Sequence, residues 1–463
     1  MRRFLPLLIV LAALAAAPSA VASELKVVAG TLTYVDADPA AANNVTVTLS
    51  GSTFTVTDSG RSGRNAIQIT SDGTCTGGRG MGTCPATGVG AINIGTGPGN
   101  DTIKVVPATP SLLAGGDGND KLTGGFADDI LNGGAGADTL NGGGGRDTAD
   151  YSDRTNPVTV TLDGKAGDGE AGENDNVGTD VENVSGGAGN DVLTGSDADN
   201  VLAGNGGDDT LSGGDGNDNL QGGAGNDTLA GGNGGDSMSG GDGTDRVTYE
   251  SYNTGVRVTL DGQPNDGVPG ENDNVDAEIV TGSPQDDVLI GGPNADDLQG
   301  GGGNDRLLGG AGADMLDAGP GDDLIQSLDG TVDTVSCGDG EDGVVSDKPD
   351  KRSDCESIKY RVMSASITAL HLSKGVVRMP IRCSPAAADG CRGRMAIRYG
   401  RNVLGTRSFH LTPGRRWRPQ LKISRHGQSL VERRNRIQAV LVVRTRDAAG
   451  VSITTRQTIR IAV

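Results

Sequence analysis

The stretch that decides the fold runs from Gly186 to Thr248, where a nine-residue unit repeats seven times without a gap. One copy reads Gly-Gly-Asp-Gly-Asn-Asp-Asn-Leu-Gln (213–221), and the next reads Gly-Gly-Ala-Gly-Asn-Asp-Thr-Leu-Ala (222–230). Glycine recurs at places one, two and four, aspartate at place six, and Leu, Met or Val at place eight. This period predicts both the fold and the chemistry of the region.

The glycine-rich places favour a tight turn, because glycine enters the positive-φ region without strain. The last three places suit a very short strand with one inward side chain. Two turns and two strands make one coil, so stacked coils put every second turn above another at a spacing of about 4.8 Å. The expected columns are Asp191, Asp209, Asp227 and Asp245 on one side and Asn200, Asp218 and Asp236 on the other.

Stacked carboxylates need a positive partner. At that spacing they repel by roughly 1 to 3 kcal/mol per neighbouring pair, for an effective dielectric constant between about 80 and 20. Calcium suits such a column better than magnesium, because it accepts about six to eight oxygen ligands in irregular geometry, whereas magnesium demands a near-ideal octahedron.

The unit resembles the hemolysin-type calcium-binding repeat of RTX proteins, a nonapeptide β-helix repeat. The resemblance implies an all-β chain with a parallel β-roll, in which place-six aspartates two units apart share a calcium ion with carbonyl oxygens of the glycine turns. Sixteen units fit the frame, and fifteen of them carry aspartate at place six. Four units lack the glycine of the pattern, at Ala127, Ala198, Gln285 and Asn294.

The candidate calcium ligands all occupy place six of a unit, and Asp101 belongs to a first, imperfect one. They are Asp101, Asp120, Asp129, Asp138, Asp147, Asp191, Asn200, Asp209, Asp218, Asp227, Asp236, Asp245, Asp287, Asp296, Asp305, Asp314 and Asp323. Several Ca²⁺ ions are therefore the expected cofactors.

Two related inserts, residues 151–185 and 250–281, interrupt the repeats. VTVTLDG at 158–164 corresponds to VRVTLDG at 256–262, and GENDNV occurs in both inserts. Their matched acidic residues are Asp163, Asp168, Glu173 and Asp175 in the first and Asp261, Asp266, Glu271 and Asp273 in the second. Two interpretations remain open, namely further calcium ligands on looped-out coils and a solvated acidic hairpin.

The N-terminus is typical of a secretory signal. Met1-Arg2-Arg3 precedes an apolar run that is short for a bilayer span, and Ala20-Val21-Ala22 offers a cleavage site. We therefore expect a secreted, extracellular protein, with association with the cell surface left open.

The expected organisation has five parts. They are a signal peptide (1–22), an N-terminal β cap (23–95), calcium-binding β-roll repeats with the two inserts (96–335), a disulfide-stapled closing coil (336–359) and a basic, immunoglobulin-like β-sandwich (360–463).

Six cysteines fall into three pairs that are close in sequence, as suits an extracellular protein. We expect disulfides between Cys75 and Cys84, Cys337 and Cys355, and Cys383 and Cys391. The alternative, a zinc site, lacks CxxC spacing and nearby histidines.

Charge is unevenly distributed along the chain. Residues 357–463 hold 22 Lys and Arg against 3 Asp and Glu, and the preceding residues hold 17 against 57. The basic part could bind an anionic cell-surface polymer or the acidic repeats themselves. We expect no nucleic-acid partner, because Trp417, Tyr399 and Phe409 are too few for a stacking platform.

No enzyme motif stands out. The histidines His371, His410 and His426 lie outside any HExxH spacing, and no GxSxG elbow occurs. The sequence therefore predicts an exported, non-enzymatic calcium-binding protein. The alternatives are a cell-surface adhesin or structural layer protein, and a secreted hydrolase with an unrecognised site.

Overall fold

The structure is a computed structural model. It describes residues 24–36, 42–59, 68–69, 75–78, 80–346, 350–355, 369–373, 376–378, 381–382, 391–399, 401–411, 416–417, 420–425, 428–429, 436–446 and 452–462. Two compact units divide the chain, one ending at Asp245 and the other beginning at Arg246. The expected signal peptide (1–22) lies outside the described residues. Within these ranges, no helix is both long and apolar enough to span a bilayer.

The first unit consists of short strands. Its N-terminal strands are β1 (Glu24–Val28), β2 (Thr31–Val35), β3 (Asn44–Ser50), β4 (Thr53–Asp58), β5 (Gln68–Ile69), β6 (Thr76–Gly78), β7 (Met81–Pro85), β8 (Ala91–Gly95) and β9 (Thr102–Val105). The first repeat cluster and insert contain β10 (Ser111–Asp117), β11 (Lys121–Thr123), β12 (Ile130–Ala135), β13 (Thr139–Asn141), β14 (Thr148–Asp150), β15 (Val158–Thr161), β16 (Ala166–Glu170), β17 (Asp175–Val177) and β18 (Asn183–Ser185). The second cluster contains β19 (Val192–Thr194), β20 (Val201–Gly206), β21 (Thr210–Asp215), β22 (Asn219–Ala224), β23 (Thr228–Asn233) and β24 (Ser237–Asp242).

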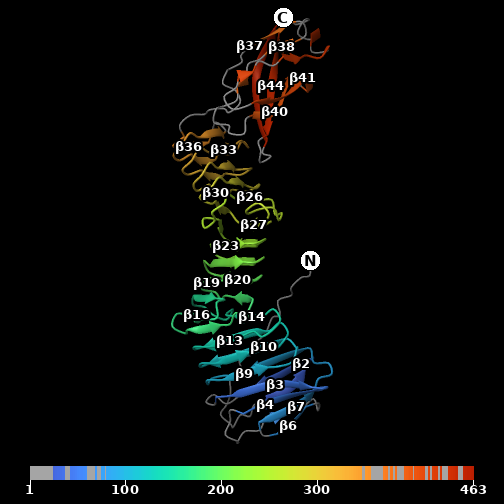
Figure 1. Cartoon of the computed structure of the whole chain (residues 1–463), viewed down its shortest axis with the longest axis vertical. Helices are drawn as coiled ribbons and strands as arrows, with labels where there is room; N and C mark the ends of the chain where they lie inside the picture. Colours follow the sequence, from blue (N-terminus) through green and yellow to red (C-terminus); the bar gives the residue numbers. More distant parts are fainter. Residues whose placement is uncertain are drawn as a thin grey trace. The chain divides into compact units, whose positions relative to one another are not determined.

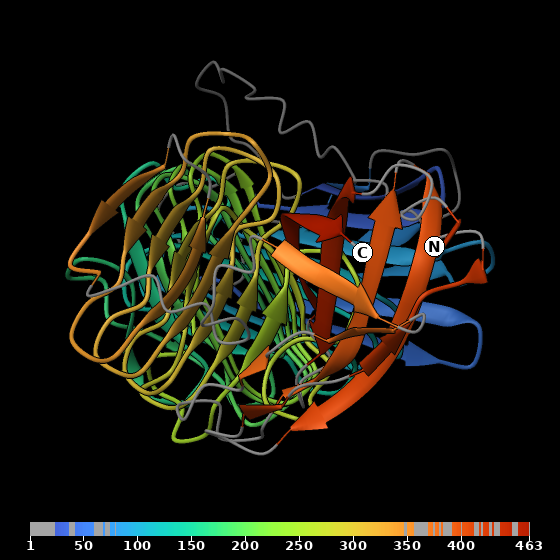
Figure 2. The same cartoon turned by 90° about the horizontal axis from the view of Figure 1, so that it is seen from above.

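The repeats stack in parallel, as the period predicts. Strand β22 pairs in parallel with β20 and β24, so that Leu220 lies opposite Leu202 and Met238. On the other side of the coil, β21 pairs in parallel with β23. Strands β20 and β23 are labelled in Figure 1, and the green strands lie behind one another when viewed from above in Figure 2. The predicted parallel β-roll is confirmed.

Each strand contributes one large side chain to the core. The place-eight residues Leu193, Leu202, Leu211, Leu220, Leu229 and Met238 are at most 1% exposed. In the second cluster, pairing continues past place nine, and Gly214 lies opposite Gly232. The three-residue strands expected from the pattern therefore lengthen there to six residues, as in β22.

The N-terminal strands extend the roll. Strand β2 pairs in parallel with β8, and β3 pairs in parallel with β9. Antiparallel partners β1 and β4 follow on the outer side. These hairpins cover the strand edge that the first coil would otherwise expose.

The first insert joins the sheet instead of looping out. Strands β15, β16 and β17 pair antiparallel, while β17 also pairs in parallel with β13 and β15 with β19. Asp168 and Asp175 are at most 3% exposed. The insert is therefore a hairpin, as one interpretation held, but these two carboxylates are buried and not solvated.

The second unit continues the same architecture. Its solenoid strands are β25 (Arg246–Thr248), β26 (Arg257–Thr259), β27 (Asn274–Asp276), β28 (Ile279–Thr281), β29 (Val288–Ile290), β30 (Asp297–Gln299), β31 (Arg306–Leu308), β32 (Met315–Asp317), β33 (Leu324–Ser327), β34 (Thr334–Ser336), β35 (Gly343–Ser346) and β36 (Lys351–Ser353). Parallel pairing runs from β26 through β29, β31 and β33 to β35.

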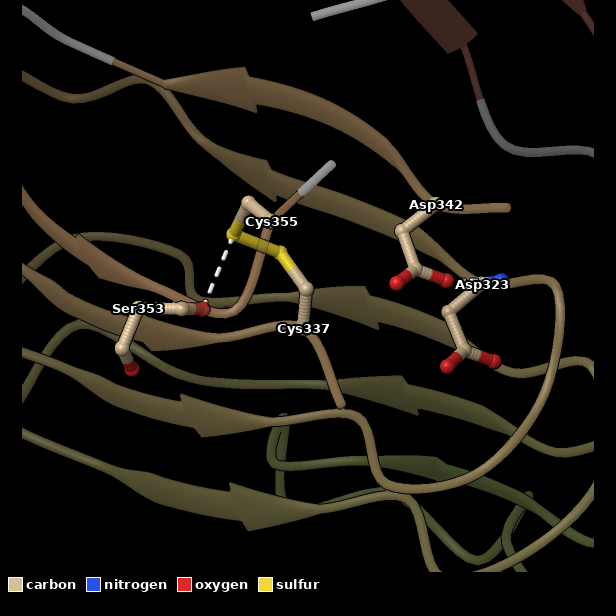
Figure 3. Close-up of a disulfide and its surroundings, with 5 residues drawn as sticks. All are labelled: Asp323, Cys337, Asp342, Ser353 and Cys355. Atoms are coloured by element: carbon tan, nitrogen blue, oxygen red, sulfur yellow. Dashed lines mark hydrogen bonds between the residues drawn. A yellow bond between two sulfur atoms is a disulfide. The ribbon is translucent and has the colours of Figure 1, made fainter. Parts of the chain in front are cut away.

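Disulfides join the predicted partners. Cys75 is bonded to Cys84, and Cys337 in the closing coil is bonded to Cys355. The Cys355 Sγ also lies 3.2 Å from the Ser353 carbonyl oxygen, and Figure 3 shows this staple beside the last coils. The third expected pair involves Cys383, which lies outside the described residues.

The C-terminal strands are β37 (Ala369–Ser373), β38 (Val376–Arg378), β39 (Ile381–Arg382), β40 (Cys391–Tyr399), β41 (Asn402–Leu411), β42 (Arg416–Trp417), β43 (Gln420–Lys422), β44 (Arg436–Arg446) and β45 (Ser452–Ala462). Seven of them form one sheet in the order β41-β40-β44-β45-β37-β38-β43, and β39 pairs with β42. The immunoglobulin-like sandwich stays a prediction.

Replacing Leu220 with alanine should destabilise the roll by about 2 to 5 kcal/mol, because a fully buried side chain leaves a cavity between two coils. Urea unfolding at saturating calcium measures this loss. Val192→Ala is the control, since Val192 is 43% exposed. Equal unfolding midpoints for the two variants would contradict a core built from place-eight residues.

Candidate metal centre

The place-six side chains form the two expected columns. The backbone N–H of Asp209 donates to the Asp227 Oδ1 at 2.8 Å, and the N–H of Asp191 donates to the Asp209 Oδ1 at 2.7 Å. The opposite column repeats this contact, from the N–H of Asn200 to the Asp218 Oδ1. All seventeen predicted ligands are buried, with at most 7% exposure. One oxygen of each stacked aspartate thus holds the neighbouring coil in register.

The second side-chain oxygen distinguishes two kinds of turn, which together account for fourteen of the seventeen candidates. We call a turn open when this oxygen is buried without a hydrogen-bond partner. Open turns occur at Asp101, Asp120, Asp138, Asp147, Asp209, Asp218, Asp227, Asp305 and Asp323. We call a turn closed when the place-two N–H donates to the place-six side chain. Closed turns occur at Asp129, Asp191, Asn200, Asp287 and Asp296. Asp236, Asp245 and Asp314 are buried in the same columns.

The backbone at place two decides which kind of turn forms. In the open turn of Asp218, Gly214 at place two has a φ of 111°, and in the open turn of Asp209, Asn205 has a φ of 74°. The place-two residues of the closed turns, such as Ser196 and Ser283, do not have positive φ. Four of the five closed turns are those that lack glycine at place four, so the sequence carried a signal for this division.

Glycine is required at place one because a larger side chain would not fit there, and not because the backbone φ is positive. A Cβ on Gly213 would meet the Asp218 Oδ2 and the Gly231 carbonyl oxygen, and φ at Gly213 is not positive. The same pair of oxygen types, from Asp227 and Gly240, surrounds Gly222. At the open turns of Asp218 and Asp227, an unpartnered carboxylate oxygen and a carbonyl oxygen of the next coil therefore face one small space.

This donor set fits a calcium ion. Within the part of the chain that the structure describes, no three His, Cys, Asp or Glu side chains gather tightly enough to bind a metal by themselves. A cation at an open turn would therefore depend on carboxylate and carbonyl oxygens together, which is the ligand chemistry of Ca²⁺.

The electrostatics favour a cation as well. Burial, followed by the charges of neighbouring carboxylates, raises the pKa of Asp209 and Asp218 to about 7, although a backbone N–H donor opposes the shift. The same causes raise the pKa of Asp305 to about 8. Without metal, these carboxyl groups hold protons near neutral pH, because their charged forms are poorly solvated.

A second ladder, at place five, runs along the exposed side of the turns. The N–H of Asn226 donates to the Asp208 Oδ1 at 2.8 Å, and the N–H of Thr244 donates to the Asn226 Oδ1 at 3.0 Å. These bonds point in the opposite direction to those of the buried columns. Asn190, Asp208 and Asn226 follow one another in this ladder, so Asp208 has no carboxylate directly above or below it there.

The columns extend beyond the predicted ligands. The N–H of Asp314 donates to the Asp333 Oδ1, and the N–H of Asp323 donates to the Asp342 Oδ1. The Asp333 Oδ2 is buried without a hydrogen-bond partner, as in an open turn. The spacing there is nineteen residues, so a strict nine-residue frame misses these positions, although Gly338, Gly340 and Asp342 keep the order of the pattern.

In calcium-free buffer, the roll should be more stable at pH 5 than at pH 8. The folded-state pKa of Asp209 is about 7, above the ordinary 3.8, so the metal-free folded chain binds more protons than the unfolded chain. This stabilisation is complete below pH 3.8 and is lost as the pH rises through about 7. Thermal melts followed by circular dichroism measure it, and a higher melting temperature at pH 8 would refute the argument.

Gly222→Ala should reduce the calcium bound per chain and lower the melting temperature in calcium, because the new methyl group fills the space beside the Asp227 Oδ2. Gly206→Ala is the matched control, since its Cβ would have no neighbour nearer than 3.9 Å and its φ is not positive. Equilibrium dialysis and thermal melts compare the two variants. Equal calcium binding would show that the space is not a metal site.

Comparison with known families finds the RTX calcium-binding nonapeptide repeat at residues 114–149, 177–211, 185–220, 212–247, 274–307 and 290–325. The matched stretches omit most of both inserts. No curated protein matches the chain. Between residues 114 and 325, the chain therefore contains multiple copies of the RTX calcium-binding nonapeptide repeat.

Proposed function

We propose that this chain is an exported, non-enzymatic calcium-binding protein whose roll closes when calcium occupies the open turns. The observation that carries the proposal is the stack of buried Oδ2 atoms that have no hydrogen-bond partner, as at Asp209, Asp218 and Asp227. A buried polar atom without a partner destabilises a fold, and a buried charge does so more strongly. A calcium ion bound to these Oδ2 atoms would give them a partner, so that the buried carboxylates would stabilise the folded roll instead of destabilising it.

Coupling of binding to folding follows from the same geometry. Each column brings carboxylates from successive coils together, and those coils are adjacent only in the folded roll. Binding free energy is then available to the folded state alone. Where calcium is scarce, the acidic repeats should stay expanded, and where calcium is abundant they should fold. Such a difference suits a chain that crosses a membrane before it folds.

Removing calcium with a chelator should abolish most of the β signal of the repeats at pH 8, and adding calcium should restore it. Circular dichroism measures both steps. Asp209→Asn should lower the calcium bound per chain, because it removes the charge at an open turn. A β signal that survives chelation unchanged would contradict folding on binding.

Asp208→Asn is the matched control for this experiment. Asp208 is exposed and lies next to Asp209. Its replacement by asparagine changes the net charge by the same amount as Asp209→Asn. Its Oδ1 accepts the N–H of Asn226, and an asparagine keeps that acceptor. Calcium binding by the control should equal that of the unchanged protein. An equal loss in both variants would indicate a general charge effect instead of a site.

Adhesion to an anionic cell-surface polymer is a second candidate function. In β40, Arg394 and Arg398 are exposed, while Met395 and Ile397 between them are buried. The register also places Arg394 opposite Arg444 on β44. The exposed positive charges of Arg394 and Arg398 on one strand repel each other, and an anionic polymer would relieve that repulsion.

Arg394→Gln combined with Arg398→Gln should lower the salt concentration at which the full chain elutes from immobilised heparin, used as a model polyanion. Arg146→Gln is the control, because Arg146 is exposed and lies in the repeats. This substitution removes one positive charge outside the C-terminal sheet. Identical elution of the double variant and the unchanged protein would remove the support for a polymer-binding sheet.

A further inference from the structure

The inserts contain buried carboxylates whose partners differ from those of the open turns. The Asp175 Oδ1 accepts the N–H of Asp138 at 2.8 Å, so Asp175 takes the next position in the column of Asp120 and Asp138. Its Oδ2, however, accepts the hydroxyl of Tyr151 at 3.0 Å. Tyr151 is 2% exposed and Asp175 is 0% exposed. A phenol hydroxyl thus provides the donor that the open turns lack.

The second insert repeats this contact. The Tyr249 hydroxyl donates to the Asp273 Oδ2 at 2.9 Å, and both residues are fully buried. Asp273 also exchanges two backbone hydrogen bonds with Asp266, each 3.0 Å long. The N-terminal hairpins contain a third example, between Tyr34 and Asp58. In all three pairs the tyrosine precedes the aspartate by twenty-four residues.

The other buried carboxylates of the inserts are also satisfied by protein donors. The Asp168 oxygens accept the N–H groups of Thr161 at 2.8 Å and Val177 at 2.9 Å. In the second insert, Asp266 accepts the N–H groups of Thr259 and Val275. In both inserts, therefore, each oxygen of these two carboxylates already has a hydrogen-bond donor from the protein.

The first insert also contains a mostly buried arginine, Arg154. The Arg154 guanidinium donates to the Gly134 carbonyl oxygen and lies 3.3 Å from a Glu173 oxygen and 3.6 Å from a Glu170 oxygen. Its side chain is only 13% exposed. A fixed positive charge thus stands against a repeat carbonyl and two carboxylates at the edge of the insert.

The turns that follow each insert are closed as well. Asp191 and Asn200 come after the first insert, and Asp287 and Asp296 come after the second, and each accepts its own place-two N–H. Open turns resume at Asp209 in the first unit. In the second unit, Asp305 is the next open turn.

We propose that residues 151–200 and 249–296 are metal-independent segments of the roll. This inference rests on the calcium binding proposed above. In each segment a tyrosine hydroxyl and backbone N–H groups take the place of calcium at the column carboxylates. The segments stay folded when calcium is removed, and they divide the open turns into groups that load calcium separately. The number of bound ions is accordingly smaller than the number of place-six residues.

The first test compares calcium bound per full-length chain in two variants. Asp175→Asn keeps an acceptor for the Asp138 N–H and an amide that can donate to the Tyr151 hydroxyl, so the count should not change. Asp209→Asn alters an open turn in the same unit, so the count should fall by at least one ion. An equal fall in both variants would overturn the inference while leaving calcium binding intact. If the protein without any substitution binds no calcium, both the proposed function and this inference are overturned.

The second test is amide hydrogen exchange of the full chain in chelator. The N–H groups of Thr161, Val177 and Gly187 should exchange at least about tenfold more slowly than those of Asp209 and Asp218, because their acceptors need no metal. Tyr151→Phe should abolish this difference for Thr161 and Val177, because it removes the donor to Asp175, which lies opposite their acceptor Asp168 in the β16–β17 pair. Equally fast exchange in the unchanged protein, or unaltered protection in Tyr151→Phe, would overturn the inference.

Discussion

The buried Oδ2 atom of the place-six aspartate is the constraint on which the solenoid depends. The Oδ1 atom of the same side chain binds the N–H of a neighbouring coil, so the carboxylate cannot turn outward without breaking the register. Glycine at place one keeps the space beside Oδ2 free, and positive φ at place two keeps the nearest N–H from filling it. Fold and cation chemistry therefore arise from the same few atoms, because the geometry that stacks the coils also leaves an oxygen to be satisfied.

Much of this could be predicted from the sequence. The nine-residue period identified the parallel roll, the place-eight core and the two columns, because period and side-chain direction are linked by strand geometry. The period could not show that Asp129 or Asp287 is satisfied by its own turn, since that depends on φ at place two. It also could not pair Tyr151 with Asp175, which lie twenty-four residues apart in an aperiodic insert. Asp333 was missed because one additional residue shifts the frame.

Closed turns and insert hairpins show that the fold can satisfy column carboxylates in more than one way. A place-two N–H serves the purpose at Asp191, and a tyrosine hydroxyl serves it at Asp175. Both supply a hydrogen-bond donor and leave the column position itself unchanged. The open turn is thus one member of a set of equivalent turns, and the one that leaves an oxygen for a cation.

All hydrogen bonds within a buried column run in the same direction, so the two ends of that column are chemically unlike. The first residue of a buried column offers a carboxylate oxygen, as at Asp101, where the Asn43 N–H satisfies it. The last aspartate of a column offers an N–H, as in the opposite column at Asp147, where Glu182 accepts it. Two bare ends of this kind would be complementary to each other. Rolls that lost such terminating residues would therefore add head to tail and grow into open-ended filaments, since nothing in that contact closes a ring.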